Sequence, residues 1–208
     1  MGQYYSALVI DENNNIKTLK PWPFDNGAKL MEHSWIGGSF MNAVYSMIHG
    51  NPCKVAWIGD YSDAPYEPKD DAYAKAMPLD EFLKFYEMAW DESEESSLEP
   101  TDFSEKQLSL VNHATSGTYL INHSRKCYLE LGAYIQRAIM KINLVNSWAI
   151  DPLSLLTACG NGRGGGDFSK SNIGYENIGI WAFDKLEYSD KMPQGYTEEV
   201  FLFKENRN

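Results

Sequence analysis

Short runs of β-forming residues, arranged in pairs around turns, constrain the fold of this chain most. In GTYLINHSRKCYLEL the residues predict two strands, Tyr119–Asn122 and Cys127–Leu131, on either side of the turn HSRK. A regular alternation of strands and helices is absent, so we expect an α+β fold with a mostly antiparallel sheet and two to four helices. The length fits a single domain, residues 1–208. Further strand pairs are expected at 3–11 with 16–22 and at 178–190 with 196–205.

The strongest helix signal is GGSFMNAVYSMIHGNP, residues 37–52. Ser39 is a natural N-cap, and apolar residues recur at helical spacing up to Gly50, which suits the position after a helix end. CKVAWIGDY then predicts a strand inside the sheet, because it is largely apolar. Three further expectations are a strand or buried loop at 28–36, a helix at 104–114 capped by Ser104, and a short helix or turn at 151–160; the segment 133–150 is left open between helix and strand.

The net charge of −11 is concentrated in one part of the chain. Residues 60–102 hold fourteen acids and three lysines, whereas the rest of the chain is balanced at fifteen acids and fifteen bases. We interpret 61–105 as an acidic helical insertion, with an amphipathic helix at 79–90 that starts after Pro78. This segment is either a solvated face or a surface for a basic protein partner, including one that handles nucleic acid. Its charge repels phosphates, so direct nucleic-acid binding by this face is not expected.

Composition bounds the location of the protein. No stretch approaches the roughly 20 apolar residues of a membrane span, and no secretory leader is visible at the start. The three cysteines, Cys53, Cys127 and Cys159, show no CxxC spacing, which indicates reduced thiols and a cytoplasmic location. The four histidines lack zinc-ligand spacing, so we expect no metal site, and no motif names a cofactor.

The stretch GNGRGGGDF, residues 160–168, is the clearest candidate for a binding site. Glycines allow backbone N–H groups to converge on an anion, and an arginine adds a planar cationic fork. The letters fit GxGxxG, but the expected strand before and helix after are missing, which argues against a dinucleotide fold. The alternative is an irregular connecting loop. The predicted ligand-binding residues of this loop are Gly160, Asn161, Gly162, Arg163, Gly164, Gly165 and Gly166.

Further candidates depend on how the chain brings the segments together. If the HSRK turn lies beside the glycine loop, Arg125 and Lys126 add cationic ligand-binding groups to it. The candidate acid–base residues are His123, Asp167, Asp60, His33 and Glu32. A half-buried structural role is the alternative for both histidines.

The sequence therefore predicts a protein that binds a small anionic ligand, such as a nucleotide or phosphodiester, through the Gly/Arg-rich loop. Hydrolase or transferase activity is left open, because no specific catalytic motif supports it. The competing hypothesis is a non-catalytic interaction or inhibitor protein that uses its acidic segment against a basic partner.

Overall fold

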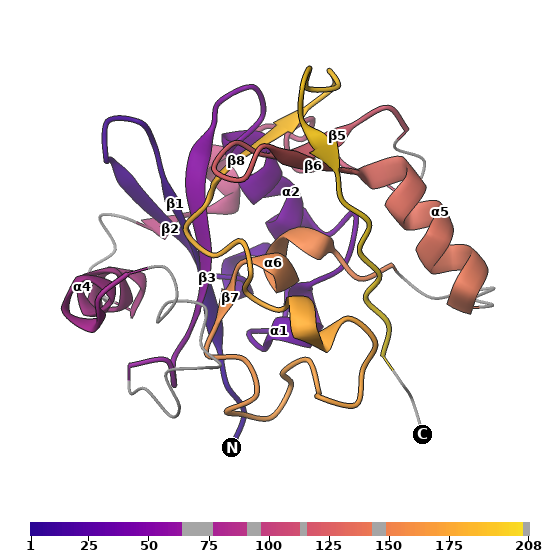
Figure 1. Ribbon diagram of the computed structural model, residues 1–208. Coiled ribbons are helices and arrows are strands. Elements are labelled where there is room, and N and C mark those ends of the chain that lie inside the picture. Colours follow the sequence, from indigo (N-terminus) through magenta and orange to yellow (C-terminus); the bar gives the residue numbers. More distant parts are fainter. Residues whose placement is uncertain (64–76, 91–96, 113–115, 143–148, 206–208) are drawn as a thin grey trace.

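The computed structural model describes residues 1–63, 77–90, 97–112, 116–142 and 149–205. These residues form one mixed, mostly antiparallel sheet with helices on both faces (Figure 1). The predicted α+β class is therefore confirmed. Five α-helices are described: α1 (Leu30–His33), α2 (Ser39–Met47), α4 (Leu79–Trp90), α5 (Leu131–Ile142) and α6 (Pro152–Leu156). Of these, α2, α4 and α5 have nine or more residues. No described helix combines the length and the apolar character needed to cross a lipid bilayer.

The sheet is built around β3 (Cys53–Gly59), which pairs with three other strands. β1 (Tyr5–Ile10) and β8 (Lys185–Ser189) pair with it antiparallel, and β7 (Ala158–Cys159) pairs with it parallel. The order across the sheet is β4-β2-β1-β3-β8-β5-β6-β9. The outer strands are β2 (Ile16–Leu19), β4 (Ser97–Leu98), β5 (Tyr119–Asn122), β6 (Cys127–Glu130) and β9 (Thr197–Glu198).

Alternation along β1 and β3 divides the apolar side chains between two cores. Tyr5, Val9 and Trp57 point to the face covered by helices α1, α2 and α6, whereas Leu8 and Ile58 point to the face covered by α4. Both strands are almost fully buried because each of their faces is covered. Figure 1 shows α4 on one side of β1–β3 and helices α1, α2 and α6 on the opposite side.

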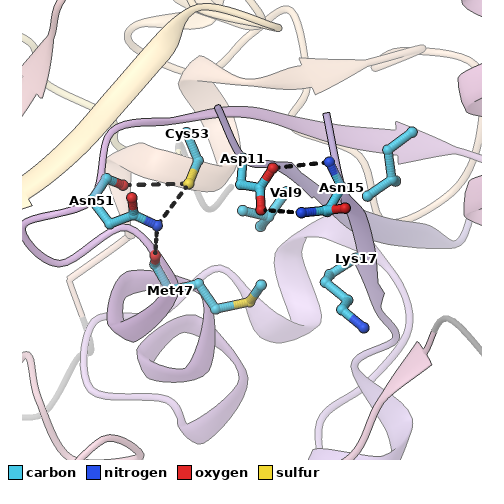
Figure 2. A pocket seen from close by; sticks show the side chains of 8 residues that line it. Val9, Asp11, Asn15, Lys17, Met47, Asn51 and Cys53 are labelled. Carbon is cyan, nitrogen blue, oxygen red and sulfur yellow. Dashed lines mark hydrogen bonds between the residues drawn. The ribbon is translucent and has the colours of Figure 1, made fainter. Parts of the chain in front are cut away.

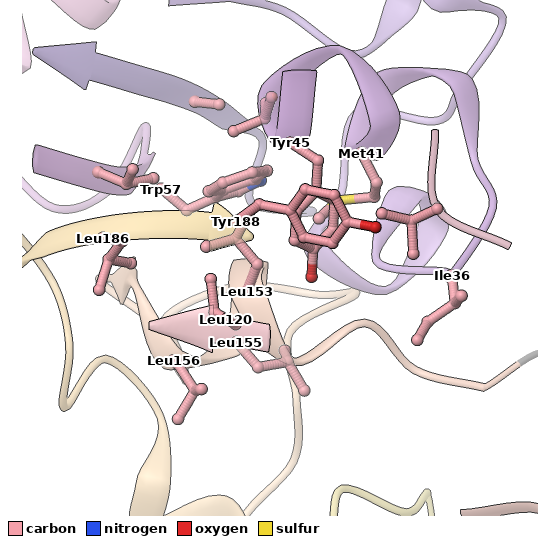
Figure 3. Packing of buried hydrophobic residues seen from close by; sticks show 14 of the residues in the cluster. Ile36, Met41, Tyr45, Trp57, Leu120, Leu153, Leu155, Leu156, Leu186 and Tyr188 are labelled. Atoms are coloured by element: carbon pink, nitrogen blue, oxygen red, sulfur yellow. The ribbon is translucent and has the colours of Figure 1, made fainter. Parts of the chain in front are cut away.

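The larger core lies under α2 (Ser39–Met47) and α6 (Pro152–Leu156). Tyr45 and Tyr188 meet edge to face beside a layer of leucines from several elements (Figure 3). The helices α1 (Leu30–His33) and α5 (Leu131–Ile142) add to the same core.

α4 (Leu79–Trp90) is the helix expected in the acidic segment. It packs on the sheet through Phe82 and Ala89, which are fully buried. Asp80, Glu81 and Glu87 stay exposed on its outer side. The acidic stretches 64–76 and 91–96, which hold seven further carboxylates of this segment, lie outside the described residues.

Several local expectations were wrong. Residues 30–33 form α1 instead of a strand or loop, and 104–112 form turns instead of a helix. The C-terminal segments do not form a hairpin, because β9 pairs parallel with β6 while β8 pairs with β3 and β5. Ser39 is not the N-cap of α2, since its hydroxyl donates to the carbonyl of Phe24 and Gly38 holds the cap position.

Candidate functional site

The glycine loop follows β7 and wraps around the first residues of the chain. The Gly165 amide donates to the Met1 carbonyl, and the Gly165 carbonyl accepts from the Gln3 amide. Gly164 is needed for this close approach, because a Cβ there would lie 2.6 Å from the Gln3 backbone nitrogen. Part of the excess of glycine therefore has a packing cause.

The loop does form an anion nest, but its occupant is the protein's own Asp167. One carboxylate oxygen of Asp167 accepts hydrogen bonds from the amides of Gly162, Arg163 and Gly164, at 2.7, 3.0 and 3.0 Å. The other oxygen accepts from the Tyr5 hydroxyl at 3.1 Å. Burial raises the pKa of Asp167, although the amide bonds act in the opposite direction. The amides predicted to hold a ligand are thus bonded to a side chain of the same loop.

Several other polar groups of the loop are also engaged. The Arg163 guanidinium donates to the carbonyl of Tyr61 at 2.6 Å, and burial lowers the pKa of this side chain. Asn161 and Phe168 exchange two hydrogen bonds between side chain and backbone. Gly166 accepts through its carbonyl from the amide of Met31 in α1. This network makes the loop a clamp between the N-terminus, α1 and β3.

Some predicted residues do gather near this clamp. Asp60, at the end of β3, accepts from the Tyr4 amide, and burial raises the pKa of its carboxyl. Glu32 forms an ion pair with Lys29, whose stem packs against Gly166. Within the described part of the chain, neither Asp60 nor Glu32 forms a hydrogen bond with Asp167.

The two candidate histidines have other partners. His33 is fully buried, and its ring nitrogens contact the Gly27 carbonyl and the Trp57 indole N–H at 2.9 and 3.0 Å. Burial lowers its pKa to about 4, so it is neutral at physiological pH. His123 contacts Glu187 and the Tyr196 hydroxyl, at 2.8 and 3.0 Å. Both rings are thus hydrogen-bonded to neighbouring groups, and His33 is fully buried instead of half-buried.

The HSRK turn does not reach the glycine loop. In Figure 1 β5 and β6, which the turn connects, lie in the upper part of the view, whereas the loop after β7 lies at the bottom beside the N-terminus. Arg125 and Lys126 therefore do not join Arg163 in one cationic pocket, because the sheet separates the two ends. Lys126 is exposed and adopts a left-handed backbone conformation.

Arg125 instead lines a cavity of about 500 Å³ on the α4 side of the sheet. Its Nε donates to Asp184 Oδ2 at 2.6 Å, and its Nη2 donates to the Ile180 carbonyl at 2.5 Å. Asn122 donates to the same carboxylate oxygen. The guanidinium is thus held in place while half of the side chain remains exposed. The other lining residues are Lys54, Met77, Pro78, Glu81, Gly179, Ala182 and Phe183.

Sequence reasoning missed most of this cavity. Asp184 was not among the predicted site residues. It lies next to the Lys54 end of β3, whereas the predicted Asp60 follows the last residue of that strand. Phe183, which has a φ of +61°, gave no signal in the sequence.

A second cavity, of about 480 Å³, lies between the β1–β2 turn and the end of α2 (Figure 2). Most of its polar side chains are hydrogen-bonded to neighbouring residues. Asp11 accepts from the Asn13 amide and twice from Asn15, and the Cys53 thiol exchanges hydrogen bonds with Asn51. Burial also raises the pKa of Cys53, which keeps the thiol protonated and unreactive.

Comparison with known protein families, with curated proteins and with solved structures finds no match for this chain. Among the described residues no group of three or more His, Cys, Asp or Glu side chains is placed to hold a metal ion.

Proposed function

We propose that the protein binds a small anionic ligand in the cavity around Arg125. The observation that carries the proposal is a half-exposed guanidinium that is already fixed by Asp184 and the Ile180 carbonyl at the wall of a cavity of about 500 Å³. Ligand pockets typically measure about 300–1,000 Å³. A pre-oriented arginine loses little side-chain entropy when it grips an oxyanion.

This proposal keeps the predicted class of ligand and moves its site. The glycine loop would first have to release Asp167 from three amides before it could accept another anion. The cavity requires no such exchange.

A thermal-shift and calorimetric screen against small carboxylates, inorganic phosphate and nucleotides tests the proposal. A ligand that stabilises the protein should lose most of its effect in Arg125→Gln and keep it in Lys126→Gln. The second variant is the matched control, because it removes the same charge from the neighbouring, exposed residue. The variant Arg163→Gln distinguishes binding in the cavity from binding at the glycine loop. An anion whose effect depends on Arg163 and not on Arg125 would overturn the assignment.

A second function, binding of a basic protein partner, is favoured by one observation on the acidic segment. None of the four ion pairs in the described residues includes an acid from 60–102, so Asp80 and Glu87 on α4 are exposed without a paired cation. Salt-sensitive binding of a lysine-rich peptide that is weakened in Asp80→Asn/Glu87→Gln, and unchanged in Arg125→Gln, would support it. Equal binding by both variants and the wild type would exclude it.

A further inference from the structure

The Arg125 cavity also carries information about which anion fits. This step rests on the proposed function, because it assigns a ligand class to the same site. The inference comes from the charges, the free edge of the guanidinium and the apolar part of the wall.

The described residues that line the cavity carry no net positive charge. Lys54 and Arg125 supply two cations, and Glu81 and Asp184 supply two carboxylates. Asp184 is bonded directly to Arg125, whereas Glu81 is exposed at the first turn of α4. A polyanion such as a nucleoside triphosphate would be repelled by Glu81 and by a chain of net charge −11, and the two cations of the cavity are already balanced by its two carboxylates. A single negative charge needs only one cation and avoids most of that repulsion.

The guanidinium retains an edge for one planar group. An arginine has five N–H donors, and the contacts of the described residues use one on Nε and one on Nη2. Nη1 and the second Nη2 hydrogen are left, and they form the end of the fork that binds two carboxylate oxygens side by side.

The rest of the wall is suited to an apolar body. Met77, Ile180, Ala182 and Phe183 line the cavity, and the Phe183 ring is held between Phe82 and Phe85 of α4, with ring centroids 6.2 and 5.2 Å away. Phe183 adopts a left-handed backbone conformation, which is unfavourable for an aromatic residue and is found where the surrounding structure imposes it.

From these three features we infer that the ligand is a monocarboxylate with an aromatic or branched apolar body. Its carboxylate binds the free edge of Arg125, with Lys54 as the second cation. Its apolar part lies against Ile180, Phe183 and Met77. An ammonium group on the same ligand would find a partner in Glu81, so amino acids are a subclass that the experiment distinguishes.

Isothermal titration of the full chain with 3-phenylpropionate, its neutral amide, phenylalanine, inorganic phosphate and ATP tests the inference. We expect 3-phenylpropionate to bind at least about tenfold more tightly than its amide, phosphate or ATP, since only it offers both the fork contact and the apolar burial. Arg125→Gln should weaken it about tenfold or more, Arg125→Lys less, and Lys126→Gln hardly at all. Met77→Gln should weaken 3-phenylpropionate and leave small anions unchanged.

The outcomes separate the two proposals. Binding of phosphate or ATP through Arg125 without binding of 3-phenylpropionate would overturn the ligand class and leave the anion site standing. No Arg125-dependent binding of any probe would overturn both. Tighter binding of phenylalanine than of 3-phenylpropionate, lost in Glu81→Gln, would place the ligand among the amino acids and support the class. Binding of 3-phenylpropionate that is insensitive to Arg125 would refute it.

Discussion

Replacing Asp167 by alanine tests whether the glycine loop is closed by its own carboxylate. The substitution removes the acceptor of three backbone amides and of the Tyr5 hydroxyl. Hydrogen bonds to a charged group contribute about 1.5–3 kcal/mol each, and buried donors left without an acceptor add a cost. These contributions are not additive in one network, and water reaches the exposed amide of Gly162.

We therefore expect Asp167→Ala to lower the free energy of unfolding by about 3–5 kcal/mol. In a chain of this length each kcal/mol corresponds to about 2–4 °C in Tm. Urea titration followed by tryptophan fluorescence measures the loss. Asp63→Ala is the matched control, because Asp63 is an exposed carboxylate close to the same loop, and it should change stability by less than about 0.5 kcal/mol.

The same variant should be rescued by added anion. Formate is small enough to replace the missing carboxylate, and binding to the folded state alone raises stability in proportion to RT ln(1 + [L]/Kd). We expect formate to stabilise Asp167→Ala and to leave the wild type unchanged at equal ionic strength. A loss no larger than that of Asp63→Ala, with no rescue, would refute the description of this loop as an occupied nest.

Three further predictions concern stability. Burial raises the pKa of Asp151 to about 7, so the contribution of this carboxyl to the free energy of unfolding is greatest below pH 4 and falls as the pH rises towards 7. Asp151→Asn should remove up to about 4 kcal/mol of that decline, as measured by unfolding titrations between pH 4 and 8. A pH profile identical to that of the wild type would contradict this. Gly164→Ala should lower the free energy of unfolding by about 2–3 kcal/mol, because the added Cβ meets the Gln3 backbone. Gly165→Ala should lower it by less than about 1 kcal/mol, because its Cβ would have no neighbour closer than 3.5 Å. Equal losses of stability in the two variants by calorimetry would refute the close packing of Gly164. Gln3 is fully buried and its side-chain amide has no hydrogen-bond partner among the described residues, so Gln3→Met should match or exceed wild-type stability, and a loss above about 2 kcal/mol would contradict this.

Local patterns were sufficient for most of the strands and for two of the three longer helices, α2 and α4, whereas the region of α5 was left open between helix and strand. The hairpin around HSRK, the buried strand β3 and the helix α4 follow from periodicity and turn residues within about fifteen positions of each other. The parallel pairing of β9 with β6 and the position of β7 beside β3 join segments that are far apart in the sequence. Nothing in the composition of such two-residue strands specifies their partners.

The candidate site shows the same division. Sequence reasoning predicted that the glycine loop binds an anion and that Arg125 adds a cation to the same site. It could not show that Asp167 folds back onto the loop amides. A loop whose amides bind its own carboxylate can have the same amino-acid composition as a loop whose amides bind a ligand. The position of Arg125 beside Asp184 depends on pairing between β5 and β8, which no short motif encodes.

The most direct test of the account is a ¹⁵N-labelled NMR titration of the wild type with 3-phenylpropionate. The account predicts that the amide signals of Arg125, Phe183 and Asp184 shift with saturation while those of Gly162, Arg163 and Gly164 stay in place. Saturable shifts confined to Gly162–Gly164 would contradict it, since they would show the anion in the glycine loop and Asp167 displaced.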